Sequence, residues 1–317
     1  SLIASVINFF FKYIPFTKNI FTYIDRLIFR DRFFKYYFDT YKPDAVIIVS
    51  TVHNEAHFMM QRSQIEGVKC IHIVESWDNP SAKLNQVKHP DYFLVWNHAM
   101  ADELNEFLGI KREKIHITGS AFHDIAAHRD SFSSKQEIAL RYGMDQDVKW
   151  ILIASTLSNL YPDFDYFLEE LDKIRSTDPV LRDSQILIRP HPQAISGYSR
   201  GHGINDLENI RRKYDYIFFD IPKVIESKLP VYLERSDIRS YSEILNIADV
   251  VISFFSTATI DASIVGTSVI LPAFDNLNKD FSYPTMRERV EFTHHSKLIA
   301  TGGVSLAYDY TELSNKL

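Results

Sequence analysis

The sequence predicts an α/β fold of two doubly wound domains, each built on a parallel β-sheet. Short, continuous apolar runs alternate with segments of helical length, first over residues 44–118 and again over residues 149–271. Such runs are typical of strands buried on both faces of a parallel sheet, and their alternation with helices is typical of doubly wound domains. A length of 317 residues is sufficient for two such domains.

The first alternation predicts a sheet whose strands each end in a polar loop. Its expected elements are strands at 45–50, 68–74, 92–96 and 114–118, and helices at 56–67 and 99–108. Right-handed crossovers bring the exits of parallel strands to one edge of the sheet. We therefore expect these exit loops to lie together.

The second alternation begins with WILIAST at residue 150, after a polar segment. Its expected elements are strands starting at 150, at 185–189, 216–219, 249–253 and 268–271, and helices at 166–175, 241–248 and 261–265. We predict an amino-terminal domain over 1–128, a linker over 129–147 and a carboxy-terminal domain over 148–317. Ligands of open α/β sheets bind beyond the carboxyl ends of the strands, so we expect the two domains to face a cleft that holds the chemistry.

Composition excludes several classes of function. The net charge of −6 gives no reason to expect a nucleic-acid partner. The single cysteine, Cys70, excludes an internal disulfide framework and fits a reducing compartment, so we expect a cytoplasmic protein. No apolar run approaches the ~20 residues of a membrane span.

Residues 1–43 are unusually aromatic and basic. They contain fourteen aromatic residues, and seven basic residues against three acidic ones. Such a segment could attach peripherally to the anionic inner face of a membrane, or its helices could pack on the first sheet with their charges solvated. We favour packing on the sheet and keep the membrane surface as the alternative partner.

Two strand exits in the second half carry side chains suited to a phosphate. After the strand at 249–253, Ser253, Ser256 and Thr257 fill a short turn before a helix that we expect to begin at Asp261. The N-terminus of a helix offers unpaired N–H groups and partial positive charge, which favour an anion. The strand at 185–189 ends in Arg189-Pro-His191-Pro. Together these exits predict a site for the phosphates of a nucleotide. His294 and His295 lack partners at metal-ligand spacing, and we interpret them as a solvated pair.

These motifs, in this order, resemble GT-B glycosyltransferases of bacterial surface-polysaccharide biosynthesis. The likeness rests on SWDNPSAK at 76–83, FLVWNHAMADEL followed by KIHITGSAFHD, ILIRPHP and the serine-rich turn. The resemblance departs at residues 1–43, which lack the usual first strands, and at the closing helix, which is missing or cut short. We therefore expect a piece of a longer protein.

The resemblance implies roles for particular residues. His191 would contact a phosphate or the nucleotide, with Arg189 close by. Ser256 and Thr257 would hold phosphate oxygens, supported by Ser253, and the ribose hydroxyls would meet Asp261. Preset donors would stabilise the leaving phosphate, so no metal or other cofactor is expected.

An acceptor hydroxyl needs a base, and we predict Asp78 for that role. Polyol-phosphate transferases carry a histidine in the comparable loop. Glu55, His53 and Glu75 are the alternatives to Asp78.

The resemblance implies a transferase that moves a sugar from a CMP-, CDP- or UDP-linked donor to a growing bacterial surface glycan. The partners would be a nucleotide-activated sugar and a glycan or lipid-linked glycan acceptor. Three alternatives remain open: a CDP-polyol phosphotransferase, an enzyme like the nucleotide-sugar 2-epimerases, and a non-catalytic module that binds glycan or protein.

Overall fold

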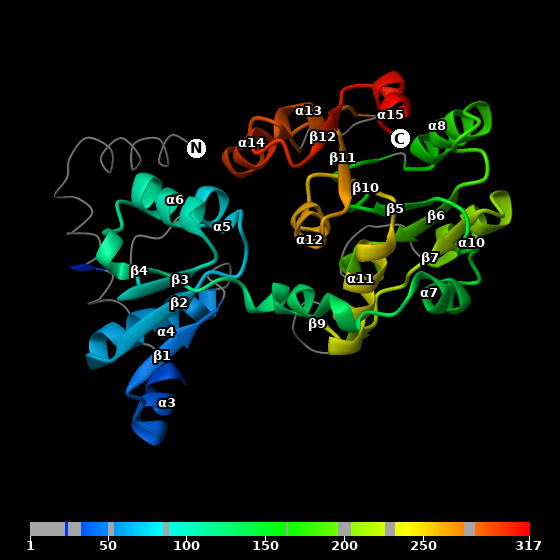
Figure 1. Cartoon of the computed structure of the whole chain (residues 1–317). Coiled ribbons are helices and arrows are strands. Elements are labelled where there is room, and N and C mark those ends of the chain that lie inside the picture. Colours follow the sequence, from blue (N-terminus) through cyan, green and yellow to red (C-terminus); the bar gives the residue numbers. More distant parts are fainter. Residues whose placement is uncertain are drawn as a thin grey trace. The chain divides into compact units, whose positions relative to one another are not determined.

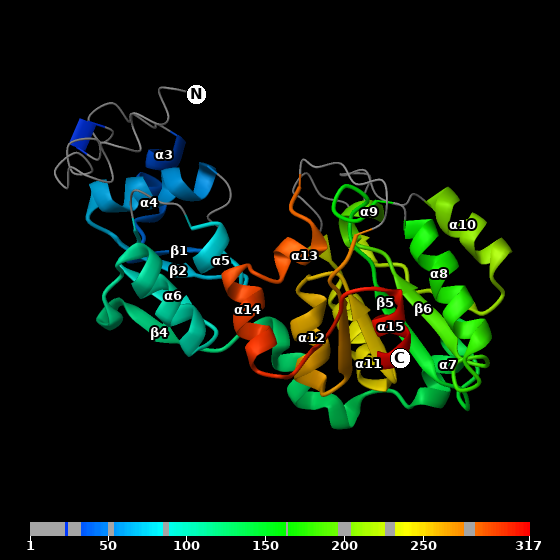
Figure 2. The same cartoon turned by 90° about the horizontal axis from the view of Figure 1, so that it is seen from above.

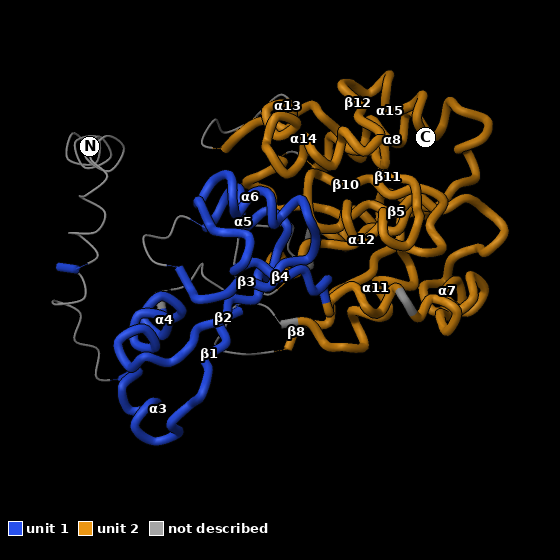
Figure 3. The backbone as a smooth tube through the Cα atoms, turned by 60° about the vertical axis from the view of Figure 1, so that its left-hand side comes forward, with its two compact units in different colours: residues 1–120 blue, residues 121–317 orange. Residues whose placement is uncertain are grey.

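The computed structural model of the chain describes residues 23–24, 33–49, 54–84, 89–162, 164–195, 204–225, 232–275 and 283–317. The chain divides into two compact units, residues 1–120 and residues 121–317 (Figure 3). Each unit has its own parallel sheet, one of four strands and one of six. The predicted fold class, two Rossmann-like parallel-sheet domains, is confirmed.

Unit 1 is a four-stranded sheet in the order β1-β2-β3-β4, with every neighbouring pair parallel (Figure 1). Its strands are β1 (Ala45–Ile48), β2 (Lys69–Ile73), β3 (Tyr92–Val95) and β4 (Ile115–Ile117). Its helices are α3 (Phe33–Tyr41), α4 (Asn54–Glu66), α5 (Asn79–Ala82), α6 (His98–Leu108) and the short 3-10 helix η1 (Arg112–Lys114). All four predicted strands and both predicted helices of this half are present.

Unit 2 is a six-stranded parallel sheet in the order β12-β11-β10-β5-β6-β7. Its strands are β5 (Trp150–Ala154), β6 (Gln185–Arg189), β7 (Ile217–Phe219), β10 (Val250–Ser253), β11 (Ser268–Pro272) and β12 (Ser305–Ala307). A separate antiparallel pair joins β8 (Val224–Ile225) to β9 (Tyr232–Leu233). The edge strand β12 was not predicted, because three residues of which only Ala307 is buried give little periodic signal.

Helices cover both faces of the unit 2 sheet. In Figure 1, α11 and α12 lie on one side of the strands, and α8 and α15 lie on the other. The helices of this unit are η2 (Ala121–Ser131), α7 (Lys135–Tyr142), α8 (Phe164–Thr177), α9 (Pro192–Ile195), α10 (Ile204–Lys213), α11 (Arg235–Ile247), α12 (Ala258–Val265), α13 (Met286–Arg289), α14 (Thr293–Ala300) and α15 (Tyr310–Lys316). This two-sided cover is what the central strands require, because every residue of β5 and β10 is buried.

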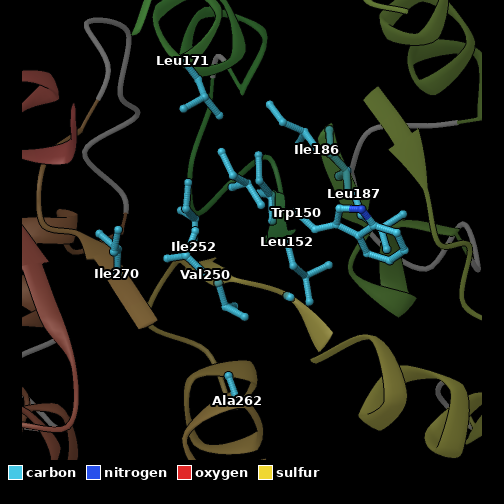
Figure 4. Packing of buried hydrophobic residues seen from close by; sticks show 14 of the residues in the cluster. Trp150, Leu152, Leu171, Ile186, Leu187, Val250, Ile252, Ala262 and Ile270 are labelled. Atoms are coloured by element: carbon cyan, nitrogen blue, oxygen red, sulfur yellow. The ribbon is translucent and has the colours of Figure 1, made fainter. Parts of the chain in front are cut away.

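The core of unit 2 lies on both sides of its central strand. All five residues of β5 are buried, as the continuous apolar run predicts. Figure 4 shows side chains of neighbouring strands between Leu171 of α8 and Ala262 of α12, which lie on opposite sides. Both side chains are 0% exposed, so the sheet is sealed by a helix layer on each face.

The segment that we predicted as a linker, 129–147, contains the end of η2 and the whole of α7. Helix α7 begins with a capping box between Ser134 and Glu137 and ends at Gly143 in the left-handed conformation. Its Ile138 and Ala139 belong to the buried core of unit 2. Two apolar residues in one helical turn were too few to distinguish this helix from polar linker sequence.

No helix in the described ranges is both long enough and apolar enough to cross a membrane. Most of residues 1–43 lie outside the described residues. Helix α3 is described, and it buries Phe38 while Phe33, Tyr36 and Tyr41 stay 63%, 61% and 70% exposed.

Candidate functional site

The strand order of unit 2 creates a switch point beside its central strand. From β5 the chain first builds β6 and β7 on one side, and then β10, β11 and β12 on the other. Ligands of open α/β sheets bind outside the carboxyl ends of the strands at such a point. Arg189 ends β6 and Ser253 ends β10, the two strands that flank β5. Since neighbouring strands lie about 4.8 Å apart, the two predicted motifs are about 10 Å apart at one edge.

The turn between β10 and α12 holds its hydroxyl groups in a chain of hydrogen bonds. Thr259 donates to the Oγ of fully buried Ser253 at 2.9 Å, and Ser253 Oγ lies 3.1 Å from Ser256 Oγ. Thr257 occupies the N-cap position of α12, but its side chain makes no capping hydrogen bond. The first N–H groups of a helix have no intrahelical acceptor. In α12, however, the N–H groups of Thr259 and Ile260 donate to the carbonyls of Ser256 and Thr257. Ser256 and Thr257 lie at the N-terminus of the helix, where its dipole favours an anion, and their role in binding phosphate stays a prediction.

The backbone of this turn adopts an unusual conformation at Phe255, whose φ is 53°. The left-handed region is uncommon for a residue with a bulky side chain. Phe255 is buried, and the ring of His295 packs against it at 5.0 Å between centroids. His295 also bonds through Nδ1 to the carbonyl of Arg289 at 2.7 Å. Helix α14 thus packs against the turn between β10 and α12.

Our interpretation of His294 and His295 as a solvated pair is wrong. The two side chains are 9% and 4% exposed. Burial, together with the neighbouring His294, lowers the pKa of His295 to about 4, so its ring is neutral at pH 7. The sequence misled because aromatic partners, Phe292 among them, cover the pair only in the folded chain.

Arg189 is held in a buried ion-pair network. Its two terminal nitrogens donate to Asp220, which follows β7, and to Asp237 on α11, and all three side chains are at most 7% exposed. Its guanidinium also lies 4.4 Å from the ring centroid of Tyr241. Burial disfavours the charge, but the two carboxylates outweigh it and raise the pKa of Arg189. This geometry favours a structural role for Arg189 over the phosphate contact that we predicted.

The carboxylates of the network also accept bonds from other elements. Tyr142 of α7 donates its hydroxyl to Asp220 at 2.7 Å, and the N–H of Lys223 donates to Asp237 at 2.9 Å. An open cavity of about 640 Å³ borders both carboxylates. The network therefore fixes the end of β6 and forms one wall of this cavity.

His191 lies two residues beyond Arg189 and directly precedes α9, the short helix labelled in Figure 2. Its Nδ1 accepts a hydrogen bond from the N–H of Gln193 at 3.2 Å. Burial lowers the pKa of His191, so the ring is neutral at pH 7. A neutral imidazole that accepts at Nδ1 carries its proton on Nε2. His191 can therefore donate a hydrogen bond from Nε2, as a contact with a phosphate oxygen requires.

Asp261, which we predicted to meet ribose hydroxyls, is paired within the protein. Its Oδ1 lies 2.9 Å from Nε2 of His123 on η2, and the two side chains are 11% and 13% exposed. Burial raises the pKa of Asp261, and the hydrogen bond from His123 offsets part of that rise. His123 lies in the GSAFHD motif, and no role was predicted for it. Its position after a predicted strand exit was the available signal, whereas its partner 138 residues later could not be seen.

In unit 1, the predicted base Asp78 immediately precedes α5. Its Oδ1 accepts a bond from Ser76 at 2.5 Å, and its Oδ2 lies 2.7 Å from Nζ of Lys83. The alternatives Glu55 and Glu75 are exposed, and His53 lies outside the described residues. Asp78 is thus held by partners on both oxygens, which is unfavourable for accepting a proton.

Within the described ranges, no three or more histidine, cysteine, aspartate or glutamate side chains are grouped as metal ligands. The predicted independence from metals and other cofactors stays a prediction.

Comparison with known proteins identifies a family and a fold. The family model of CDP-Glycerol:Poly(glycerophosphate) glycerophosphotransferase matches residues 25–277. The search of curated proteins found no match.

Three solved structures show the likeness in fold. A putative UDP-N-acetylglucosamine 2-epimerase of Listeria monocytogenes is 12% identical with a TM-score of 0.55, and the alignment covers 89% of this chain and 66% of that one. The S. aureus MnaA–UDP structure is 13% identical with a TM-score of 0.56, covering 94% and 71%. The Methanocaldococcus jannaschii UDP-GlcNAc 2-epimerase, in complex with UDP-GlcNAc and UDP, is 12% identical with a TM-score of 0.55, covering 89% and 70%. This chain therefore spans about two thirds of their length, and identities this low establish a shared GT-B-type fold alone.

Proposed function

Because the chain belongs to the CDP-glycerol:poly(glycerophosphate) glycerophosphotransferase family, we propose that it transfers a polyol phosphate from a CDP-linked donor to a hydroxyl of a growing surface polymer. Sugar transfer was the first form of our prediction and polyol-phosphate transfer its alternative. The family favours the alternative. The acceptor is a glycan or lipid-linked polymer, in keeping with the resemblance.

The observation that carries the proposal is the pairing of two donor groups at one switch point. His191 presents Nε2–H beyond β6, and the hydroxyl-lined turn before α12 lies beyond β10. Both suit a diphosphate, because each offers phosphate oxygens a hydrogen-bond donor that is partly shielded from water. Ser256 and Thr257 would bind these oxygens and His191 would stabilise the departing CMP.

The chemistry is a displacement at phosphorus. The acceptor hydroxyl oxygen forms a bond to the phosphorus of the polyol phosphate. The bond from that phosphorus to the bridging oxygen breaks, and CMP leaves with the electron pair. The hydroxyl proton passes to a base. The protein therefore has to orient the donor, offset the growing charge on CMP and accept one proton.

The test is CMP release from CDP-glycerol in the presence of a glycerol phosphate oligomer. We expect release that depends on the acceptor, and His191→Ala should lower kcat/KM at least tenfold, or about 1.4 kcal/mol. His191→Gln is the matched variant, because its amide can still donate from nearly the position of Nε2 and should recover part of the rate. Release from UDP-GlcNAc but not from CDP-glycerol would contradict the proposal. An unchanged rate in His191→Ala would remove His191 from the site.

We further propose peripheral attachment to the inner face of the membrane, where a lipid-linked acceptor would lie. Helix α3 supports this, because it exposes Phe33, Tyr36 and Tyr41, and residues 1–43 carry seven basic residues against three acidic ones. Aromatic rings suit the membrane interface, and basic side chains suit anionic headgroups.

A further inference from the structure

Three adjoining cavities lie on unit 2 beside the helices α7 and α11. The first, of about 460 Å³, is lined by α7, α10 and the end of β7, and it shares Arg141 and Tyr142 with the second, of about 640 Å³. The second shares Ser236 and Arg239 with the third, of about 470 Å³, which reaches η2. Single ligand pockets are typically about 300–1,000 Å³. The three cavities therefore form one continuous groove, which suits a chain-like ligand.

Each cavity is bordered by one basic side chain that has no ion-pair partner among the described residues. Arg211 borders the first cavity, Lys223 the second and Arg235 the third. All three residues are exposed. Their positive charges are therefore available to an anion along the whole length of the groove.

A buried carboxylate fixes two further arginines at the wall of the groove. Glu243 of α11 is 3% exposed, and it accepts hydrogen bonds from Nε of Arg239 at 3.1 Å and from Arg141 at 3.4 Å. It also accepts bonds from the N–H and the hydroxyl of Ser133, both at 3.2 Å. The side chains of Arg141 and Arg239 stay 41% and 44% exposed. Since a guanidinium has five N–H donors in a plane that matches phosphate, each arginine can also bind an anion in the groove.

The acidic side chains that border the groove are all paired already. Asp220 and Asp237 bind Arg189, Glu208 lies 3.6 Å from Arg212, and Glu243 binds the two arginines described above. These carboxylates, their partners and the three unpaired cations comprise seven basic residues against four acidic ones. The whole chain has a net charge of −6, so the groove concentrates positive charge on an acidic protein.

We propose that this basic groove binds the phosphodiester backbone of the acceptor polymer, which carries a negative charge on every repeat. The groove passes close to the proposed donor site, because Asp220 and Asp237 border its middle cavity and hold Arg189, two residues before His191. Successive phosphates of one chain reinforce one another's binding, because they are linked. This inference rests on the proposed function, which supplies the identity of the acceptor.

Direct binding tests the groove without turnover. A glycerol phosphate oligomer labelled at one end reports binding by fluorescence anisotropy in the absence of a donor. We expect the parent protein to bind it with an affinity that falls as salt is added. The triple variant Arg211→Gln, Lys223→Gln and Arg235→Gln should bind at least tenfold more weakly. Its melting temperature and its affinity for CMP should stay close to those of the parent, because the three side chains are exposed.

Two matched variants control for net charge and for position. Lys173→Gln, Arg182→Gln and Lys316→Gln together remove the same charge outside the groove. Lys173 and Lys316 belong to α8 and α15, on the face of the sheet opposite α11 (Figure 1), and Arg182 lies before β6, where the strand begins. This control should bind the oligomer like the parent. Exchanging arginine for lysine and lysine for arginine at the three groove positions keeps the charge and should restore the affinity to within a few-fold.

The outcomes separate this inference from the proposed function. No binding of the oligomer by the parent, parental affinity in the triple variant, or an equal loss in the control outside the groove would overturn the role of the groove. Parental oligomer affinity together with weaker binding to phosphatidylglycerol vesicles would assign the groove to lipid headgroups instead. With CDP-glycerol as donor, the triple variant should raise the KM for a long oligomer far more than it changes kcat. A parent that binds the oligomer through the groove but releases no CMP would contradict the proposed function alone.

Discussion

Arg189→Met tests whether the arginine beside His191 supports the fold or binds the donor. Removing the guanidinium leaves the carboxylates of Asp220 and Asp237 buried without their cationic partner, since these side chains are 7% and 3% exposed. Breaking a buried ion pair by deleting one partner costs about 3–5 kcal/mol, because a charge stays buried without compensation. Here two carboxylates lose their partner and the contact of the guanidinium with Tyr241 is lost. We therefore expect the free energy of unfolding to fall by an amount at the upper end of that range.

The matched variant removes the stranded charges as well. In Arg189→Met with Asp220→Asn and Asp237→Asn, the amide oxygens can still accept the bonds from Tyr142 and from the N–H of Lys223. We expect this triple variant to recover more than half of the lost stability, because neutral amides are far cheaper to bury than carboxylates. Such a recovery would show that the unpaired buried carboxylates cause the loss of stability.

Urea unfolding followed by tryptophan fluorescence measures both effects, since Trp150 is 1% exposed in the core of unit 2. A loss below about 1 kcal/mol in Arg189→Met would refute the reasoning, because a group held by two buried carboxylates cannot be removed so cheaply. CMP binding to the folded triple variant then decides the role of Arg189. Affinity within a few-fold of the parent supports a structural role, and a tenfold or greater loss supports the direct phosphate contact predicted from the sequence.

Two further predictions concern unit 1. His72 is fully buried, no described residue hydrogen-bonds its ring, and burial followed by the charge of His57 lowers its pKa from 6.5 to about 4. On acidification the unfolded chain protonates His72 before the folded chain does, so the free energy of unfolding should fall by up to about 3 kcal/mol between pH 6.5 and pH 4. In His72→Leu, thermal melts across this pH range should no longer show that fall. A variant with the same pH profile as the parent protein would contradict the assignment. For the membrane proposal, we expect the protein to co-sediment with phosphatidylglycerol vesicles. Added salt, or substitution of Phe33, Tyr36 and Tyr41 by serine, should weaken this binding. Equal binding to uncharged vesicles would refute the electrostatic part of the proposal.

The sequence alone was sufficient for all four strands of the first sheet and for five of the six strands of the second. The buried strands were found because burial on two faces imposes a continuous apolar run, as in WILIA of β5. The turn of Ser256 and Thr257 was placed because a strand exit leading into a helix is visible in local chemistry. Helix α7 and strand β12 were missed because their burial depends on partners distant in sequence.

The tertiary structure decided which side chains meet. Arg189 and His191 have the same local appearance, yet Asp220 and Asp237 bind the first, and Gln193 orients the second. The partnership of His123 with Asp261 spans 138 residues and leaves no periodic trace. Local pattern thus determines where chain segments bury apolar surface, because that depends on each residue's own chemistry. Pairing between polar groups depends on distance and direction across the fold, which no single segment contains.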